Sequence, residues 1–457
     1  MPSVARRRQA VATLQVVRKL WLPLILALAA ATGVGSANAA TGVVVRGAGY
    51  GHGVGLSQYG AYGFAKQGRE YEEILAHYYR DTELSRTDDQ PVRVLLRDQA
   101  PSIVLRGALR AGTSALSGRR LYTARPVGTS RVELRDRRGR RIGRFPTPLA
   151  VSGADRNLQL VGCAPINGIQ DGHYRGTLEI RRSEGGGLTV VNELPVDEYL
   201  QGVIPGEVPP SWPAEALKAQ AVAARSYALA TNVADEVFDQ YPDTRSQVYQ
   251  GADAERPSTN AAARKTGLQV LRSDGKVIVA NFFSTSGGKT ENVENGFAGA
   301  ESRPYLKSVE DPFDDISPLH DWRLGYSTSD MQERLDEFVK GKFRRIEVKE
   351  RGVSPRIISA EIVGSKGRTE VSGAELKAEL DLYDTWAFFR NVRGRGLPDG
   401  PPEAPEGGSG CLRLERVSLG DRPQPKPKRQ RGTARPAPRP ESPAPALGAS
   451  LGVIARG

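Results

Sequence analysis

The sequence predicts an α+β fold, with a mixed, β-rich scaffold around a central region that carries helices. Short runs of alternating apolar and charged residues recur over residues 92–191 between Gly-rich turns, as is typical of sheets with one solvent-exposed face. By contrast, Leu217, Ala221, Ala224 and Ala228 recur at helical spacing. From about residue 391, Pro, Gly, Ala and Arg dominate, so this C-terminal tail cannot bury a core and is predicted to be disordered.

The N-terminal 39 residues read as a secretory signal peptide. Five basic residues and no acids precede a short apolar run at 20–31, and Ala-Asn-Ala follows at 37–39. We therefore expect a secreted or cell-wall-associated protein; an uncleaved membrane anchor is the alternative. Residues 40–390 are expected to form the main domain, and residues 391–457 the tail. Within that domain we distinguish a Gly-rich segment (43–84), a β-rich part (92–191) and a helix-bearing part (192–390).

The charge balance indicates anionic partners. The formal net charge is +12, which suits cell-wall polymers or a membrane surface. Nucleic acid is not expected, because no basic helix has interleaved aromatic residues. The basic tail is either a tether to anionic wall polymers or inert. Cys163, Cys411 and four scattered histidines have no metal-ligand spacing, so neither a metal nor a cofactor is expected. The sequence does not decide whether Cys163 and Cys411 form a disulfide.

Residues 194–232 contain the candidate catalytic acid. Glu207 is expected in a turn rich in Pro and Gly, and Pro213 is well placed to begin the helix that follows. Lys218 and Arg225, seven residues apart on that helix, project from nearly the same side. They form either a solvated helix face or part of a binding site.

Two other segments have the composition of ligand-binding loops. Residues 47–60 carry Gly at alternate positions, which permits close approach of a ligand, but they lack the dinucleotide-binding pattern. His52 is there either a turn residue held by backbone or a sugar contact. An apolar strand at 277–283 leads into Ser284, Thr285 and Ser286, a hydroxyl-rich loop suited to a polyol or sugar. Phe283 stands where a phosphate-binding loop needs Gly. No Gly-x-Ser-x-Gly motif supports a serine hydrolase.

These segments resemble a known family. Residues 191–200, 206–209 and 215–227 are similar to the SpoIID/LytB (stage II sporulation protein D) family, and residues 284–292 and 49–61 resemble two further family signatures. The Gly-His-Gly segment comes first here instead of last, which predicts a circular permutation. The family's frequent zinc site has no counterpart at 238–249, which lack Cys and His. The family loop also often has His at the position of Phe283.

The resemblance implies a peptidoglycan lytic transglycosylase. Such an enzyme cleaves glycan strands between N-acetylmuramic acid and N-acetylglucosamine and leaves an anhydromuramyl product, with Glu207 as acid and then base. One carboxyl suffices, because a hydroxyl of the muramic acid itself displaces the leaving group, unlike most glycosidases. The alternatives are a non-catalytic wall-glycan binder, an activator of a partner amidase, or a structural wall protein. The residues expected to contact the glycan are His52, Ser57, Gln58, Lys218, Gln220, Arg225, Ser284, Thr285 and Ser286.

Overall fold

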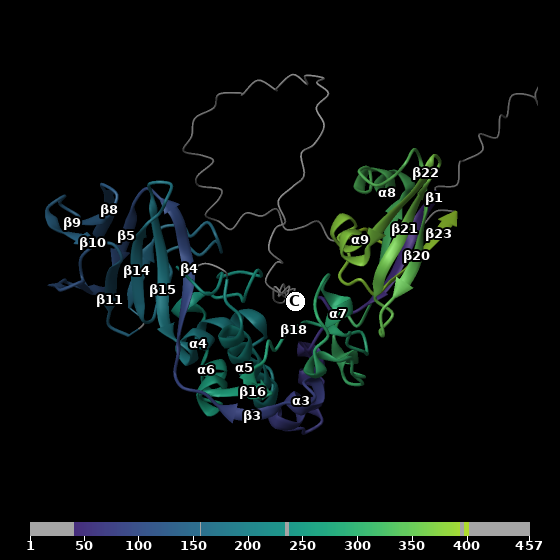
Figure 1. Cartoon of the computed structure of the whole chain (residues 1–457), viewed down its shortest axis with the longest axis horizontal. Helices are drawn as coiled ribbons and strands as arrows, with labels where there is room; N and C mark the ends of the chain where they lie inside the picture. The colour runs from purple at the N-terminus through teal and green to yellow at the C-terminus, as the bar shows by residue number, and fades with distance from the viewer. Residues whose placement is uncertain (1–40, 156, 234–236, 394–396, 402–457) are drawn as a thin grey trace, which may run out of the picture.

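The computed structural model describes residues 41–155, 157–233, 237–393 and 397–401. It confirms the α+β class, with helices and several separate sheets. Figure 1 shows a β-rich lobe at one end, a helical region in the middle and a second β-containing lobe at the other end. The predicted signal peptide, Cys411 and most of the predicted tail lie outside the described residues.

The β-rich lobe is a pair of six-stranded antiparallel sheets. One sheet has the order β4-β15-β14-β11-β6-β7 and the other β10-β9-β8-β5-β12-β13. On β9, the apolar residues Val132 and Leu134 are fully buried and Arg131 is exposed, as the predicted alternation requires, whereas Glu133 is also buried. The strands are β4 (Pro91–Ala100), β5 (Ile103–Arg106), β6 (Ala108–Ala111), β7 (Ser114–Ala115), β8 (Tyr122–Val127), β9 (Arg131–Asp136), β10 (Arg141–Pro146), β11 (Leu149–Gly153), β12 (Leu158–Val161), β13 (His173–Tyr174), β14 (Thr177–Arg182) and β15 (Leu188–Pro195).

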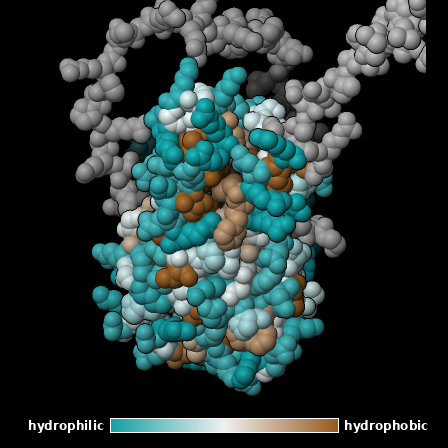
Figure 2. All heavy atoms as spheres, turned by 90° about the vertical axis from the view of Figure 1, so that its right-hand side faces the viewer, coloured by the Kyte–Doolittle hydropathy of each residue, from teal (hydrophilic) through white to brown (hydrophobic). Residues whose placement is uncertain are grey.

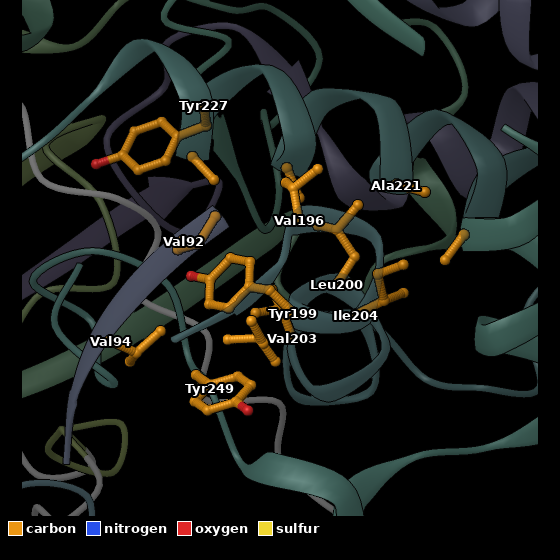
Figure 3. Packing of buried hydrophobic residues seen from close by; sticks show 14 of the residues in the cluster. Val92, Val94, Val196, Tyr199, Leu200, Val203, Ile204, Ala221, Tyr227 and Tyr249 are labelled. Atoms are coloured by element: carbon orange, nitrogen blue, oxygen red, sulfur yellow. The ribbon is translucent and has the colours of Figure 1, made fainter. Parts of the chain in front are cut away.

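The helical region is organised around α5 (Ala214–Ala230), which contacts four other helices. Its many alanines leave little side-chain volume, so its neighbours approach closely, and most of its residues are buried. Figure 3 shows Tyr199 of α4 close to Val92 of β4, with Leu200 and Val203 of the same helix in the surrounding cluster. The other elements of this region are α2 (Gln58–Lys66), α3 (Tyr71–Tyr78), α4 (Val196–Glu207), α6 (Pro257–Lys265), the 3₁₀ turn η1 (Gly251–Ala254), β2 (Leu56–Ser57), β3 (Glu83–Arg86), β16 (Gln269–Ser273), β17 (Lys276–Val277) and β18 (Phe282–Phe283).

The second β-containing lobe joins both ends of the described chain. Strand β1 (Thr41–Ala48) is the central strand of a sheet, antiparallel to β19 (Asp321–Ser327) on one side and β23 (Ala387–Arg393) on the other. The surface of this end is mostly hydrophilic, with hydrophobic residues in a central strip (Figure 2). The remaining elements are α7 (Val293–Gly296), η2 (Pro304–Leu306), η3 (Asp314–Ile316), α8 (Thr328–Arg334), β20 (Phe343–Arg351), β21 (Ile357–Gly364), β22 (Gly367–Ser372) and α9 (Gly373–Glu379).

The structure corrects two predicted boundaries. The apolar strand expected over 277–283 is interrupted, since only β17 and β18 at its ends form ladders. The tail begins later than residue 391, because β23 continues to Arg393 and the Asp399 carbonyl accepts a hydrogen bond from Gly325. None of the described helices is long and apolar enough to span a membrane.

Candidate functional site

Glu207 is the last residue of α4. The sequence had suggested a turn at this position, and that expectation is wrong. Pro205 lies inside the last turn of this helix, and extended backbone begins only at Val208. The Glu207 side chain has no exposed surface, and its Oε1 accepts a hydrogen bond from the Val248 backbone N–H at 2.9 Å. The candidate acid is therefore enclosed at a helix end and held by a segment that follows α5.

The segment around Val248 also connects α4 to α5. The Tyr199 hydroxyl donates to Gln247 Oε1 at 3.1 Å, and Gln247 Nε2 donates to the Ala224 carbonyl at 3.3 Å. Burial, followed by the negative charge of Glu207, raises the pKa of Tyr199 well above its ordinary value, so this phenol stays protonated. Sequence inspection missed Gln247 and Val248, because a backbone N–H and a lone Gln have no pattern to find.

The loop after Glu207 is fixed to α2 by aromatic contacts. The half-buried Trp212 ring stacks on Tyr62, with centroids 4.8 Å apart and an angle of 11° between the rings. It meets Tyr59 edge-on at 5.0 Å. Such pairs add roughly 0.5–1.5 kcal/mol each. The path of the chain beside Glu207 is therefore tied to the Gly-His-Gly segment that precedes α2.

The structure brings the three predicted motifs together. Strands β2 and β18 pair in parallel, and the Tyr59 N–H donates to the Ser284 carbonyl at 3.0 Å. Gln58 Nε2 lies 3.4 Å from Gln220 Oε1, which links α2 to α5. Segments separated by more than 150 residues in sequence thus form one region next to α5.

Most of the predicted glycan contacts in this region are buried. Ser57 caps α2 by accepting from the Gly60 N–H, Thr285 Oγ1 lies 2.7 Å from Ser317 Oγ, and Ser286 Oγ accepts from the Gly288 N–H. Ser284, Gln58 and Gln220 are also buried. Their hydrogen-bonding groups face the interior in this structure, so their role in glycan binding stays a prediction.

Arg225 does not line a groove, which corrects the sequence-based expectation. Its side chain is fully buried, and it donates to Asp197 Oδ1 at 2.7 Å and to the carbonyls of Gln269 and Ala263 at 3.0 and 3.1 Å. Burial lowers the pKa of this guanidinium from its ordinary value. Arg225 therefore clamps α5 to α4, α6 and β16.

Lys218 is one of the two predicted contacts that keep exposed surface. Its ammonium pairs with Glu215 at 2.7 Å and lies 5.1 Å from the centre of the Tyr71 ring. Lys218 and Arg225 thus start from similar sides of α5 but end in different environments, one at the surface and one inside the protein.

His52, the other contact with exposed surface, is held by backbone and borders a cavity of about 720 Å³. Its Nε2 lies 3.1 Å from the Phe282 carbonyl, and its Nδ1 accepts from the Val54 N–H. Burial, with the positive charges of Lys377 and Arg356, lowers the pKa of His52 to about 3. The ring is therefore neutral at physiological pH, with its proton on Nε2.

Asp311 is a buried acid that sequence inspection did not select. The Tyr78 hydroxyl donates to its Oδ1 at 2.7 Å, and its Oδ2 has no hydrogen-bond partner among the described residues. Burial, with the nearby charge of Asp314, raises the pKa of Asp311 from 3.8 to about 7. A raised pKa means that the folded protein binds this proton more tightly than the unfolded chain. The protonated Asp311 side chain therefore makes its full contribution to the free energy of unfolding below about pH 4, and this contribution is lost as the pH rises through about 7.

Asp311→Asn is expected to stabilise the protein at pH 8 and to have little effect at pH 4. The amide keeps an acceptor for Tyr78 and cannot ionise. The difference between the two pKa values sets an upper limit of roughly 4 kcal/mol on the gain. Urea unfolding of both proteins at several pH values measures it, and an equal difference at every pH would contradict the assignment.

Metal ligands are not grouped in the described part of the chain, where no three His, Cys, Asp or Glu side chains are placed to hold an ion. Cys163 is half-buried in the loop after β12.

Comparisons with known proteins match the region around Glu207. Residues 184–273 match the family model "SpoIID: Stage II sporulation protein". An uncharacterised protein of Brachyspira hyodysenteriae is 40% identical over 147 residues, covering 32% of this chain and 38% of its own. Stage II sporulation protein D of Bacillus amyloliquefaciens is 32% identical over 211 residues, covering 42% and 59%. The amidase enhancer of Bacillus subtilis is 38% identical over 142 residues, covering 31% and 19%.

The matched segment contains α4, α5, α6 and the buried Glu207. The matches span between 19% and 59% of the length of these relatives. Residues 184–273 of this chain are thus similar to the stage II sporulation protein D (SpoIID) family, as the motifs of the sequence had indicated.

Proposed function

We propose that this protein acts on the bacterial cell wall as a lytic transglycosylase that cleaves peptidoglycan glycan strands. The observation that carries the proposal is the enclosed carboxyl of Glu207, held by the Val248 N–H within the family segment. Buried sites are where a carboxyl can carry a proton at neutral pH. Because the substrate lies outside the cytoplasm, the proposal also requires export, as residues 1–39 predict.

Glu207 would serve as acid and then as base in one displacement. It first protonates the glycosidic oxygen, so that the bond from C1 of N-acetylmuramic acid to N-acetylglucosamine breaks. The carboxylate then removes the proton of the muramyl C6 hydroxyl, whose oxygen bonds to C1 and forms the 1,6-anhydro ring. No water is consumed, and Glu207 ends with its proton restored. The enclosed state of the carboxyl requires that residues of the 208–213 loop or of the Val248 segment move aside when a strand binds.

A second candidate is a non-catalytic wall protein that stimulates a partner amidase. Two observations favour it: the similarity to an amidase enhancer, and the lack of exposed surface on Glu207. In that case the protein binds wall glycan and leaves the strand intact, while the partner releases stem peptides.

Product analysis distinguishes the two candidates. Purified peptidoglycan, intact or stripped of stem peptides, is incubated with the protein, and the soluble fragments are identified by mass spectrometry. We expect fragments ending in 1,6-anhydromuramic acid, which are lighter by one water than hydrolysed ends. Products with only reducing ends, or no soluble product from either substrate, would rule out a lytic transglycosylase. Faster peptide release when an amidase is added, without cleavage of strands, would support the second candidate.

A further inference from the structure

Most of the protein's net positive charge is concentrated in one part of the β-rich lobe. Residues 101–144 contain twelve arginines, no lysine and two acids, a net charge of +10, while the whole chain carries +12. This segment contains β5 to β9 and the first four residues of β10. From the sequence, this segment was interpreted as scaffold, and only the basic tail was considered as a tether to wall polymers, with an inert tail as the alternative.

The fold places many of these arginines on one face of the sheet. On β9, Arg131, Glu133 and Arg135 point outward, because the alternating Val132 and Leu134 are fully buried. The register then aligns outward-facing side chains across β8, β9 and β10, in the rows Arg125–Glu133–Arg144 and Thr123–Arg135–Arg141.

Glu133 and Asp136 position the arginines and add little negative charge to the surface. Glu133 is 4% exposed and pairs with Arg135 at 2.6 Å and with Arg144 at 2.8 Å. Its hydrogen bonds to Arg144 and Arg135 lower the pKa of Glu133, so it stays ionised. Asp136 accepts from the N–H groups of Arg138 and Arg140 in the β9–β10 turn. The carboxylates thus lie beneath the guanidinium groups.

Other arginines of this face have no ion-pair partner. Within the described part of the chain, Arg125, Arg131 and Arg137 are exposed and form no salt bridge. Arg125 and Arg137 line a hollow of about 650 Å³. Its lining consists of Val104, Leu121, Thr123, Arg125, Pro126, Val127, Glu133, Arg135, Asp136, Arg137 and Gly139.

We propose that this arginine face, defined by Arg125, Arg131, Arg135, Arg137 and Arg144, binds a phosphodiester-linked anionic polymer. Guanidinium groups bind phosphate oxygens in a bidentate manner. Outward side chains are about 6.8 Å apart along a strand and about 4.8 Å apart across strands, a spacing at which a flexible polyphosphate can meet several arginines at once. This inference does not depend on the activity proposed for Glu207.

The composition of the face favours a soluble polymer over a membrane or nucleic acid. Large exposed hydrophobic side chains, which reinforce binding to a lipid surface, are absent from β8, β9 and β10. Tyr122, an aromatic residue of these strands, is buried, and Phe145 is half-buried, so neither forms an open platform for stacking bases. Figure 1 shows β8, β9 and β10 at the end of the molecule away from the second lobe. A polymer bound there would leave the region around α5 uncovered.

The test measures binding of the full chain to fluorescent poly(glycerol phosphate) at several salt concentrations. The triple variant Arg125→Gln/Arg131→Gln/Arg137→Gln is expected to bind about 10-fold or more weakly at low salt. Its plot of log K against log salt should be less steep by up to about three. The matched control is Arg323→Gln/Arg344→Gln/Arg390→Gln, which removes equal charge from exposed positions of the second lobe and should bind within about twofold of wild type.

Three outcomes would overturn the proposal. Equal weakening by both triple variants would show that net charge alone matters. Undetectable binding of poly(glycerol phosphate) at low salt would show that the arginine face is not a binding site for such a polymer. Tighter binding, at equal phosphate concentration, to phosphatidylglycerol vesicles or double-stranded DNA would assign the face to another partner. Unchanged melting temperatures of both triple variants show that the comparison is between folded proteins.

Discussion

Glu207→Gln is expected to lower the rate of glycan cleavage by about 10²–10⁴-fold, the usual range for loss of a general acid or base. The amide cannot donate a proton to the glycosidic oxygen or accept one from the C6 hydroxyl. It keeps the shape of the side chain and an oxygen that can accept from the Val248 N–H. The fold should therefore persist while activity is lost, and release of anhydromuramyl fragments over time measures the effect.

The matched control for this variant is Glu198→Gln, on the same helix and half-buried. Burial raises the pKa of Glu198, so this acid shares two features with a catalytic carboxyl but lies nearly two and a half turns away. Activity within about twofold of wild type is expected for the control. Equal loss in both variants, or none in Glu207→Gln, would disprove the assignment of Glu207.

Arg225→Ala is expected to destabilise the protein by roughly 3–5 kcal/mol, as is typical when one partner of a buried ion pair is removed. The change removes the guanidinium donors to the carbonyls of Gln269 and Ala263 and opens space between α5 and its neighbours. Asp197 also loses its cation, although its side chain keeps 28% of its surface exposed. Urea unfolding curves of variant and wild type give the difference.

Lys218→Ala is the comparison on the same helix. Its ion pair with Glu215 is partly exposed and should contribute about 0–1 kcal/mol, so the unfolding midpoint should move little. The reverse pattern, with a stable Arg225→Ala that binds peptidoglycan poorly, would restore Arg225 as a glycan contact.

Local patterns predicted the elements well but not the environments of polar residues. The strand at 158–161 and the helix through Ala214–Ala230 follow from alternation and from Leu and Ala at helical spacing, which reflect burial of one face. Arg225 was expected in a binding groove or on a solvated helix face but is buried. A search for apolar periodicity does not predict a charged residue in the core. Only the approach of Asp197 and of two carbonyls, from elements far apart in sequence, makes its burial favourable.

In the candidate site, too, the sequence indicated which residues matter but not the contacts that enclose them. Glu207 could be selected from its motif, and the meeting of residues 57–58 with 284–286 was expected from the family signatures. The enclosure of Glu207 by Val248, and of Asp311 by Tyr78, depends on contacts across more than 40 and 200 residues, respectively. The excess of arginine over residues 101–144 can be counted in the sequence, but its arrangement in rows on one face depends on the register of β8, β9 and β10.

The central position of β1 in the second lobe has a consequence for how the chain folds. Val43 pairs with Tyr326 and Asn391, which lie 283 and 348 residues further along. Contacts of such long sequence separation give a high contact order, and they form late because a long loop must close first. During synthesis on the ribosome, β1 is made first, and its two edges stay unpaired until β19 and then β23 have been synthesised. Early termination before residue 387 would leave one edge of β1 open, where it could pair with another chain.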